Sequence, residues 1–128
     1  LSENDWENWP ALRQALGDRV LVLGDDFLCT NPARIARAVK EKCCTALLLK
    51  VNQVGTLNEA AEARRLARQA GWKITVSARS GETEDNWLAD LATAWGDQIK
   101  VGSICQSERL AKYNRLLEIE AEGLPKTP

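Results

Sequence analysis

The sequence predicts an α/β fold made of four strand–helix units. Strand-like segments bounded by turn residues occur at residues 19–23, 46–51, 73–77 and 98–101. Their starts lie about 25 to 27 residues apart, which is the spacing of consecutive strand–helix units. The segments are short and rich in Val, Ile and Leu, as is typical of parallel strands covered on both faces. The periodicity leaves open whether the sheet is open and doubly wound or part of a barrel.

The first two strand segments are each followed by a helix with a clear start signal. In the helix expected over residues 30–42, Asn31 is the predicted N-cap. The helix expected over residues 56–71 begins with Thr56 and Glu59, which have the spacing of a capping box.

The last two helices are predicted from apolar residues at helical spacing. The helix over residues 107–123 would turn Leu110 and Leu117 toward the core. The helix over residues 83–95 would bury a stripe of Trp87, Leu88, Leu91 and Trp95.

A chain of 128 residues is long enough for one compact domain with a core. Another amphipathic segment, around residues 3–17, precedes the first strand and predicts a leading helix. We therefore expect one domain over residues 1–123 and a flexible tail over residues 124–128.

Composition and charge exclude several classes of function. With 17 basic and 18 acidic residues and no basic cluster, the chain has no bulk attraction to nucleic acid or to anionic lipid. Its apolar runs are far shorter than the 18 or so residues of a membrane span, and no signal segment opens it, so we expect a cytoplasmic protein.

The four cysteines form no CxxC pair and have no histidine to complete a zinc site. We expect them to be buried, reduced thiols.

Polar residues lie at the carboxyl ends of all four expected strands, and these ends meet on one rim of a parallel sheet. Asp25, Lys50, Arg79 and Lys100 occupy these positions. A cluster of a carboxylate, lysines and an arginine suits abstraction of a proton next to a metal-bound carboxylate. The absence of histidine excludes a serine nucleophile with a histidine base, and no glycine-rich phosphate loop is present.

Each of these side chains also has a structural interpretation. Asp25 or Asp26 could cap a turn. Lys50, which strand alternation directs inward, either forms a structural ion pair with an aspartate or is kept neutral by nearby cations and accepts a proton. Arg79 either binds a phosphate or carboxylate, or forms a salt bridge with an acid of the following SGETED segment, Glu82 or Glu84.

Six segments, in unbroken order over nearly the whole chain, resemble the carboxyl-terminal part of the enolases. These segments are LSENDWENW, GDDFLCTNPARI, LLLKVNQVGTLNEA, SARSGETED, GDQIKVGS and SERLAKYNRLLEIE. The resemblance implies that the four units are the carboxyl-terminal half of a TIM-type (β/α)8 barrel. It also implies a glycolytic lyase that uses Mg²⁺ to dehydrate 2-phosphoglycerate, a small phosphorylated acid, to phosphoenolpyruvate.

The same resemblance implies a role for each rim residue. By it, Asp25 matches a magnesium ligand, and Lys50 matches the base that removes the proton from C2 of the substrate. Arg79 and Ser80 match the phosphate-binding pair. Lys100 matches the lysine that neutralises the substrate carboxylate.

The chain departs from the family pattern at Ala78, where the S-H-R-S motif of enolases carries histidine. A methyl group cannot form a hydrogen bond to a substrate, and the other acidic ligands and closing loops of the family lie outside this chain. We therefore expect the chain alone to be inactive and to bind Mg²⁺ weakly at most, because one carboxylate is too few.

Half a barrel would expose two strand edges and an apolar inner layer. We therefore expect self-association, with a two-fold dimer as the simplest arrangement, or pairing with the missing barrel half. Two alternatives to an enzyme follow. The chain could be a non-catalytic, self-associating scaffold, or a module that binds phosphate or another anion without turnover.

Overall fold

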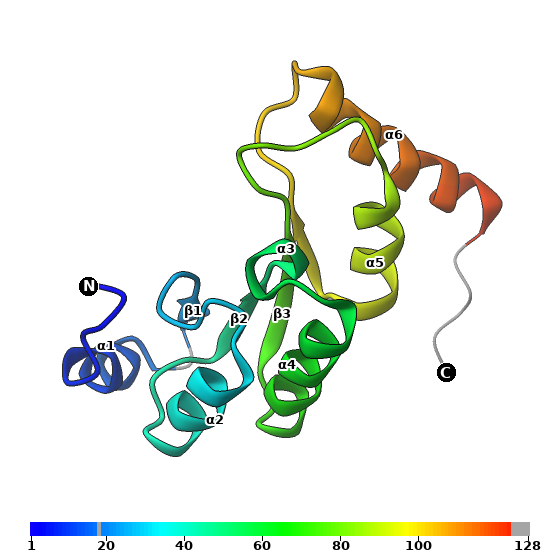
Figure 1. The fold of residues 1–128 in the computed structure, drawn as a ribbon. Helices are drawn as coiled ribbons and strands as arrows, with labels where there is room; N and C mark the ends of the chain where they lie inside the picture. Colours follow the sequence, from blue (N-terminus) through cyan, green and yellow to red (C-terminus); the bar gives the residue numbers. More distant parts are fainter. Residues whose placement is uncertain (18, 124–128) are drawn as a thin grey trace. The chain divides into compact units, whose positions relative to one another are not determined.

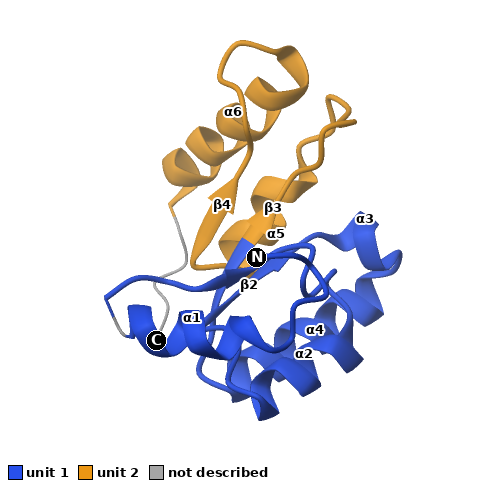
Figure 2. Cartoon of the chain, turned by 90° about the vertical axis from the view of Figure 1, so that its left-hand side faces the viewer, with its two compact units in different colours: residues 1–75 blue, residues 76–128 orange. Residues whose placement is uncertain are grey.

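The computed structural model describes residues 1–17 and 19–123, so the tail expected at residues 124–128 lies outside the described residues. The chain forms two compact units, unit 1 over residues 1–75 and unit 2 from residue 76 onward (Figure 2). Unit 1 contains α1 (Asn8–Leu16), β1 (Leu23–Gly24), α2 (Pro32–Lys40), β2 (Ala46–Leu49), α3 (Val51–Val54) and α4 (Leu57–Gln69) (Figure 1). Unit 2 contains α5 (Trp87–Trp95), β4 (Gln98–Lys100) and α6 (Ser107–Glu122), and the boundary falls within β3 (Lys73–Ser77).

The strand order is β1-β2-β3-β4, so each strand neighbours the next one along the chain. β1 pairs in parallel with β2, with Leu23 opposite Ala46 and Gly24 opposite Leu47. Helices alternate with these strands, which confirms the predicted α/β class.

The first strand lies later in the chain than predicted. Val20 and Leu21 are exposed, whereas Val22 is buried and its carbonyl oxygen accepts hydrogen bonds from the N–H groups of Thr45 and Ala46. The apolar run at residues 19–23 therefore begins outside the core, because burial starts where the backbone meets the residues leading into β2.

The second strand is shorter than predicted, while the third lies where the sequence placed it. β2 ends at Leu49, and the following residues form α3, a one-turn helix that sequence periodicity did not predict. Four residues are too few to show a helical period, so this segment could not be separated from the strand before it.

The predicted N-caps of α2 and α4 are confirmed. The Asn31 side chain accepts hydrogen bonds from the N–H groups of Ala33 and Arg34. The Thr56 hydroxyl accepts one from the Glu59 N–H at 3.2 Å and donates to the Glu59 carboxylate at 2.6 Å. Both helices then pack small buried faces into unit 1, Ile35 and Ala38 from α2 and three alanines from α4.

The leading helix is present, and an aromatic cluster holds the segment around it. The rings of Trp6 and Trp9 lie 4.4 and 4.5 Å from the ring of Phe27, centroid to centroid. The Arg37 guanidinium lies 3.9 Å from the Trp6 ring centre, and Arg34 donates from Nε to the Phe27 carbonyl at 2.7 Å. Aromatic rings attract each other and guanidinium groups, so Trp6 and Trp9 hold the leading segment against α2 and the turn after β1.

The buried faces of α5 and α6 differ from those predicted. In α5, Leu88, Ala89 and Ala92 are buried while Trp87 is 44% exposed, so the predicted stripe is wrong at Trp87.

In α6, Leu110 and Leu117 are exposed, and the residues buried in their place are Arg109 and Lys112. The prediction failed because it assumed that an apolar surface covers α6. The groups that Arg109 and Lys112 meet are instead backbone carbonyl oxygens and the Glu82 carboxylate.

The cysteines are partly as predicted. Cys43 and Cys44 are buried, Cys29 is half-buried, and Cys105 is exposed, so the expected burial is wrong for Cys105. All four are free thiols. Burial, with a smaller contribution from Glu41 and against the opposing effect of Arg37, raises the pKa of Cys43 to about 11. Burial and the neighbouring Cys43 raise the pKa of Cys44 to about 12. Within the described part of the chain, no helix is long and apolar enough to cross a bilayer.

Thiol labelling tests this burial. A pKa raised from 9.0 to about 11 leaves roughly 100-fold less thiolate at pH 8, and thiolate is the form that reacts. We expect iodoacetamide to modify Cys105 far faster than Cys43 or Cys44 in the folded chain, as measured by mass spectrometry of timed samples. In denaturant all four should react at similar rates. Equal labelling rates in the folded chain would show that Cys43 and Cys44 are not buried.

Candidate functional site

In unit 1, a buried lysine and an aspartate form the centre of the candidate site. Lys50 follows β2 directly and is 7% exposed. Its Nζ forms an ion pair with Oδ1 of Asp25, which follows β1, and lies 3.9 Å from Oδ1 of Asp26. Gln53 on α3 donates from Nε2 to Asp26 Oδ1 at 3.1 Å. The ion pair that the sequence left as one interpretation of Lys50 is therefore present, and a role in proton transfer stays a prediction.

Thr30 fixes the backbone at Lys50 and was not singled out from the sequence. It is fully buried, and its hydroxyl accepts a hydrogen bond from the Lys50 N–H at 2.9 Å. Cys29 and Thr30 have φ angles of 51° and 53°, in the left-handed region that side chains other than glycine rarely adopt. No sequence signal reveals this turn, because neither residue type is associated with positive φ.

Gly24 allows the strand end and the turn to approach closely. A Cβ atom at this position would lie 2.4 Å from Cδ1 of Leu28 and 3.1 Å from Sγ of Cys44. No side chain fits there, so glycine is needed for the turn that brings Asp25 to Lys50.

A cavity of about 300 Å³ in unit 1 lies beside Asp25 and Asp26. Its lining includes Glu3, Trp9, Asp25, Asp26 and Phe27. Among residues 1–17 and 19–123, no group of three or more Cys, Asp or Glu side chains is arranged to hold a metal ion. The residues described here therefore do not by themselves fit a magnesium site, which draws about six oxygen ligands.

In unit 2, Arg79 and Ser80 lie just beyond the end of β3. The N–H of Ala78 donates to the carbonyl of Lys100 at 2.9 Å, which extends the pairing of β3 and β4 by one residue. Arg79 and Ser80 are exposed, and the Ala78 methyl group is nearly buried. The Arg79 side chain forms no ion pair with any residue that the structure describes. Glu82 instead accepts a hydrogen bond from the Arg79 backbone N–H at 2.7 Å.

The six predicted site residues thus form one group in each unit. The structure brings Asp25 and Lys50 together in unit 1, and it joins Ala78 to Lys100 through the backbone in unit 2. Arg79 and Ser80 follow Ala78 directly in that second group. The single rim that the sequence predicts for all of them stays a prediction.

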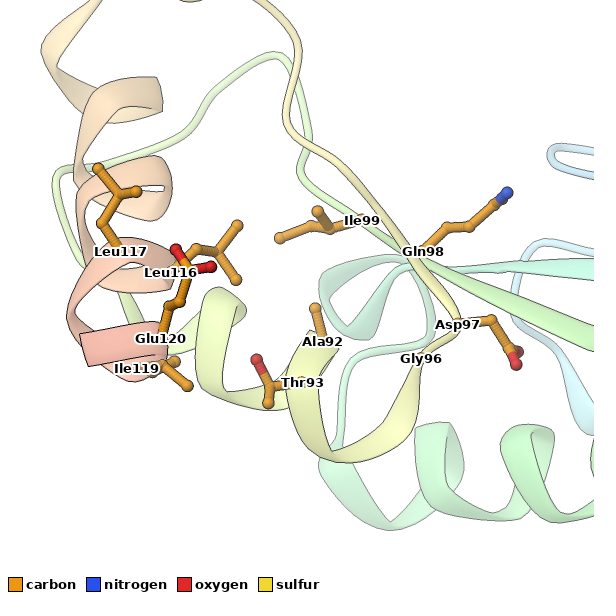
Figure 3. A pocket seen from close by; sticks show the side chains of 10 residues that line it. All are labelled: Ala92, Thr93, Gly96, Asp97, Gln98, Ile99, Leu116, Leu117, Ile119 and Glu120. Carbon is orange, nitrogen blue, oxygen red and sulfur yellow. The ribbon is translucent and has the colours of Figure 1, made fainter. Parts of the chain in front are cut away.

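Unit 2 also contains a groove of about 440 Å³ between α5, β4 and α6, which we call the α5–α6 groove (Figure 3). Ile99 of β4 and Leu116, Leu117 and Ile119 of α6 contribute apolar side chains to it. Its charged lining residues, Asp97 and Glu120, are acidic, so it is unsuited to binding a phosphate. The groove is therefore separate in chemistry from the loop that carries Arg79.

The family model and the similar proteins that match this chain all point to one family. Residues 1–126 match the family model described as "Enolase, C-terminal TIM barrel domain". Similar curated proteins include Enolase 1 of Methylococcus capsulatus, 54% identical over 123 residues, which are 95% of this chain and 29% of that protein. Enolase B of Dictyostelium discoideum and the enolase of Solanum lycopersicum are each 53% identical over 121 residues, 94% of this chain and 27% of theirs. The chain therefore spans less than a third of the length of these relatives.

The Asp25→Asn variant tests the buried ion pair. The substitution leaves the Lys50 ammonium without its carboxylate, and we expect the free energy of unfolding to fall by about 1–3 kcal/mol. Denaturant unfolding measures this change. Asp26→Asn is the matched control, because Asp26 is 71% exposed at the side chain and should contribute less than about 1 kcal/mol. Equal losses in the two variants would contradict the importance of the buried pair.

Proposed function

The chain belongs to the enolase family, and from this premise we propose that it carries part of a site that dehydrates 2-phosphoglycerate to phosphoenolpyruvate in the cytoplasm. The observation that carries the proposal is Lys50, a buried lysine held against Asp25 at the carboxyl ends of neighbouring parallel strands. Active sites of α/β barrels lie at this end of the strands. A lysine buried at this position can therefore take part in the reaction as well as in an ion pair that stabilises the fold.

Lys50 is the proposed base that removes the proton from C2. Its Nζ is paired with Asp25 at the carboxyl ends of β1 and β2, and this ion pair fixes the position of the amine. A lysine accepts a proton only as the neutral amine, which is the form that the proposed role of Lys50 requires.

Arg79, Ser80 and Lys100 are the proposed substrate-binding residues. The Arg79 guanidinium offers several N–H donors in a fixed plane, which suits a phosphate, and the Ser80 hydroxyl adds another donor. Lys100 would neutralise the substrate carboxylate and so stabilise the extra negative charge that forms when the C2 proton leaves.

We propose that the chain by itself does not turn over substrate. The Ala78 methyl group supplies no hydrogen bond at the family's histidine position. Mg²⁺, which the family resemblance implies, would receive one carboxylate from Asp25 and need further oxygen ligands from outside the described residues.

A direct assay tests the enzymatic proposal. Formation of phosphoenolpyruvate from 2-phosphoglycerate with Mg²⁺ should be undetectable for the chain alone. It should appear in an Ala78→His variant when the remaining part of an enolase is supplied. A Lys50→Ala control in the same mixture should abolish it, since no base remains. Turnover by the unmodified chain alone would overturn the proposed inactivity.

Phosphate binding tests the proposed anion site independently of turnover. We expect Arg79→Ala to weaken binding of inorganic phosphate roughly 10- to 100-fold, which corresponds to the loss of a charge-assisted hydrogen bond. Isothermal titration calorimetry measures the affinity. Arg65→Ala is the matched control, because Arg65 is an exposed arginine of unit 1 that pairs with Glu62 on its own helix. An equal loss in both variants would indicate nonspecific attraction by surface cations.

A second candidate function is that of a self-associating half-barrel. β4 ends the strand order, the apolar α5–α6 groove flanks it, and Leu117 at this groove is 63% exposed. An open strand edge next to an apolar groove favours association, and we propose a second copy of the chain as its partner.

Light scattering tests this second candidate. The chain should form dimers at micromolar concentration, and Leu117→Glu should shift it toward monomers because the charge would be buried at the interface. Leu57→Glu serves as the control, since Leu57 is similarly exposed at 54% but belongs to unit 1. A monomeric chain with its helices formed would exclude this candidate.

A further inference from the structure

We infer that Lys112 and Arg109 of α6 are positioning residues for the 79–83 loop, and that phosphate affinity at Arg79 and Ser80 depends on them. The inference rests on the proposed function, because it takes this loop to be the anion-binding segment. The polar residues that the sequence predicts at the strand ends do not include either of these α6 residues.

The face that α6 buries is the first step of the argument. Lys112 is fully buried and Arg109 is 9% exposed, while Leu110 and Leu117 on the same helix are exposed. A buried cation costs free energy unless charged or polar partners replace the water it loses. This face of α6 therefore packs through polar contacts, and its two buried cations must have partners that make their burial possible.

Those partners lie in the 79–83 loop. Nζ of Lys112 lies 3.1 Å from Oε2 of Glu82 and donates to the carbonyl of Thr83 at 2.6 Å. Arg109 donates from Nη2 to the carbonyl of Ser80 at 3.1 Å. A second bond, from Nη1 of Arg109 to the Val101 carbonyl at 3.0 Å, ties the same guanidinium to the end of β4.

Glu82 transmits this anchoring to Arg79. One carboxylate oxygen of Glu82 faces Lys112, and the other accepts a hydrogen bond from the Arg79 N–H at 2.7 Å. The backbone of Arg79 is thereby fixed while its guanidinium forms no ion pair with a described residue. A binding group held in place before the ligand arrives loses less conformational freedom on binding, so the affinity is higher.

The charge of Lys112 has a second effect. Glu82 lies three residues from Arg79 and would repel a phosphate or pair with the guanidinium if its charge were not compensated. Lys112 compensates that charge from inside the fold, where the lysine has no access to the phosphate. It therefore acts through Glu82 and the loop and makes no contact with the anion.

The test compares Lys112→Met with Arg115→Met in the full chain, with inorganic phosphate as the probe. Arg115 lies three residues further along α6 and pairs with Asp90 of α5 at 2.8 Å, so it is a cation of the same helix without contact to the loop. We expect Lys112→Met to weaken phosphate binding about tenfold or more and Arg115→Met to leave it within about twofold. Adding Glu82→Gln to Lys112→Met should recover part of the affinity, because it removes the uncompensated carboxylate.

Amide hydrogen exchange provides a readout that separates positioning from general stability. In Lys112→Met, the amides of residues 79–83 should exchange faster while those of β3 and α5 keep their protection. Should Lys112→Met fail to fold, Arg109→Lys keeps the charge, loses the two-pronged contact, and should weaken phosphate binding several-fold.

The possible outcomes distinguish this inference from the proposed function. Unchanged phosphate affinity and unchanged loop exchange in Lys112→Met would overturn the inference and leave the anion site intact. If the unmodified chain binds no phosphate, the proposed anion site is wrong. Hydrogen exchange of the 79–83 loop in Lys112→Met then decides whether Lys112 positions the loop. Faster exchange confined to the loop supports the positioning role, and unchanged exchange overturns it.

Discussion

A lysine removed from water needs a carboxylate close to it, and among the described residues each unit contains such a pair. In unit 1, Lys50 meets Asp25, and in unit 2, Lys112 meets Glu82. In both pairs, the carboxylate belongs to the segment that follows a strand. The two segments that carry the candidate functional residues are therefore fixed by charge pairing as well as by apolar packing.

This constraint connects the fold to the proposed chemistry. The lysine in unit 1 is the proposed base, whereas the lysine in unit 2 is the proposed support of the 79–83 loop in its own unit. The difference follows from burial: Lys50 lies beside partly exposed aspartates, and Lys112 is enclosed completely. A lysine–carboxylate pair that is partly open to water can thus present a reactive group, whereas a pair with a fully buried lysine can hold a binding loop.

Much of the fold was predictable because its signals are local. The N-caps at Asn31 and Thr56 and the limits of β3 follow from residue types within a few positions of each other. The spacing of the apolar segments likewise predicted the four strand–helix repeats, and the long sequence motifs indicated the enolase family.

The errors arose where tertiary partners decide the outcome. An apolar stripe predicts burial only if an apolar surface covers it, and the buried face of α6 at Arg109 and Lys112 meets carbonyl groups instead. The candidate site was predictable in its residue types and strand-end positions. Thr30 and Lys112 were not, because buried hydrogen bonds between segments 20 to 30 residues apart leave no periodic trace in a sequence.

The turn after β1 shows how such a site limits the stability of the chain. Two successive residues, Cys29 and Thr30, hold left-handed backbone angles that cost roughly 1–2 kcal/mol each. Glycine at position 30 would relieve that strain but would remove the hydroxyl that receives the Lys50 N–H. Relief of backbone strain and retention of the hydrogen bond to the Lys50 N–H therefore oppose each other at this position, and threonine keeps the bond at the cost of the strain.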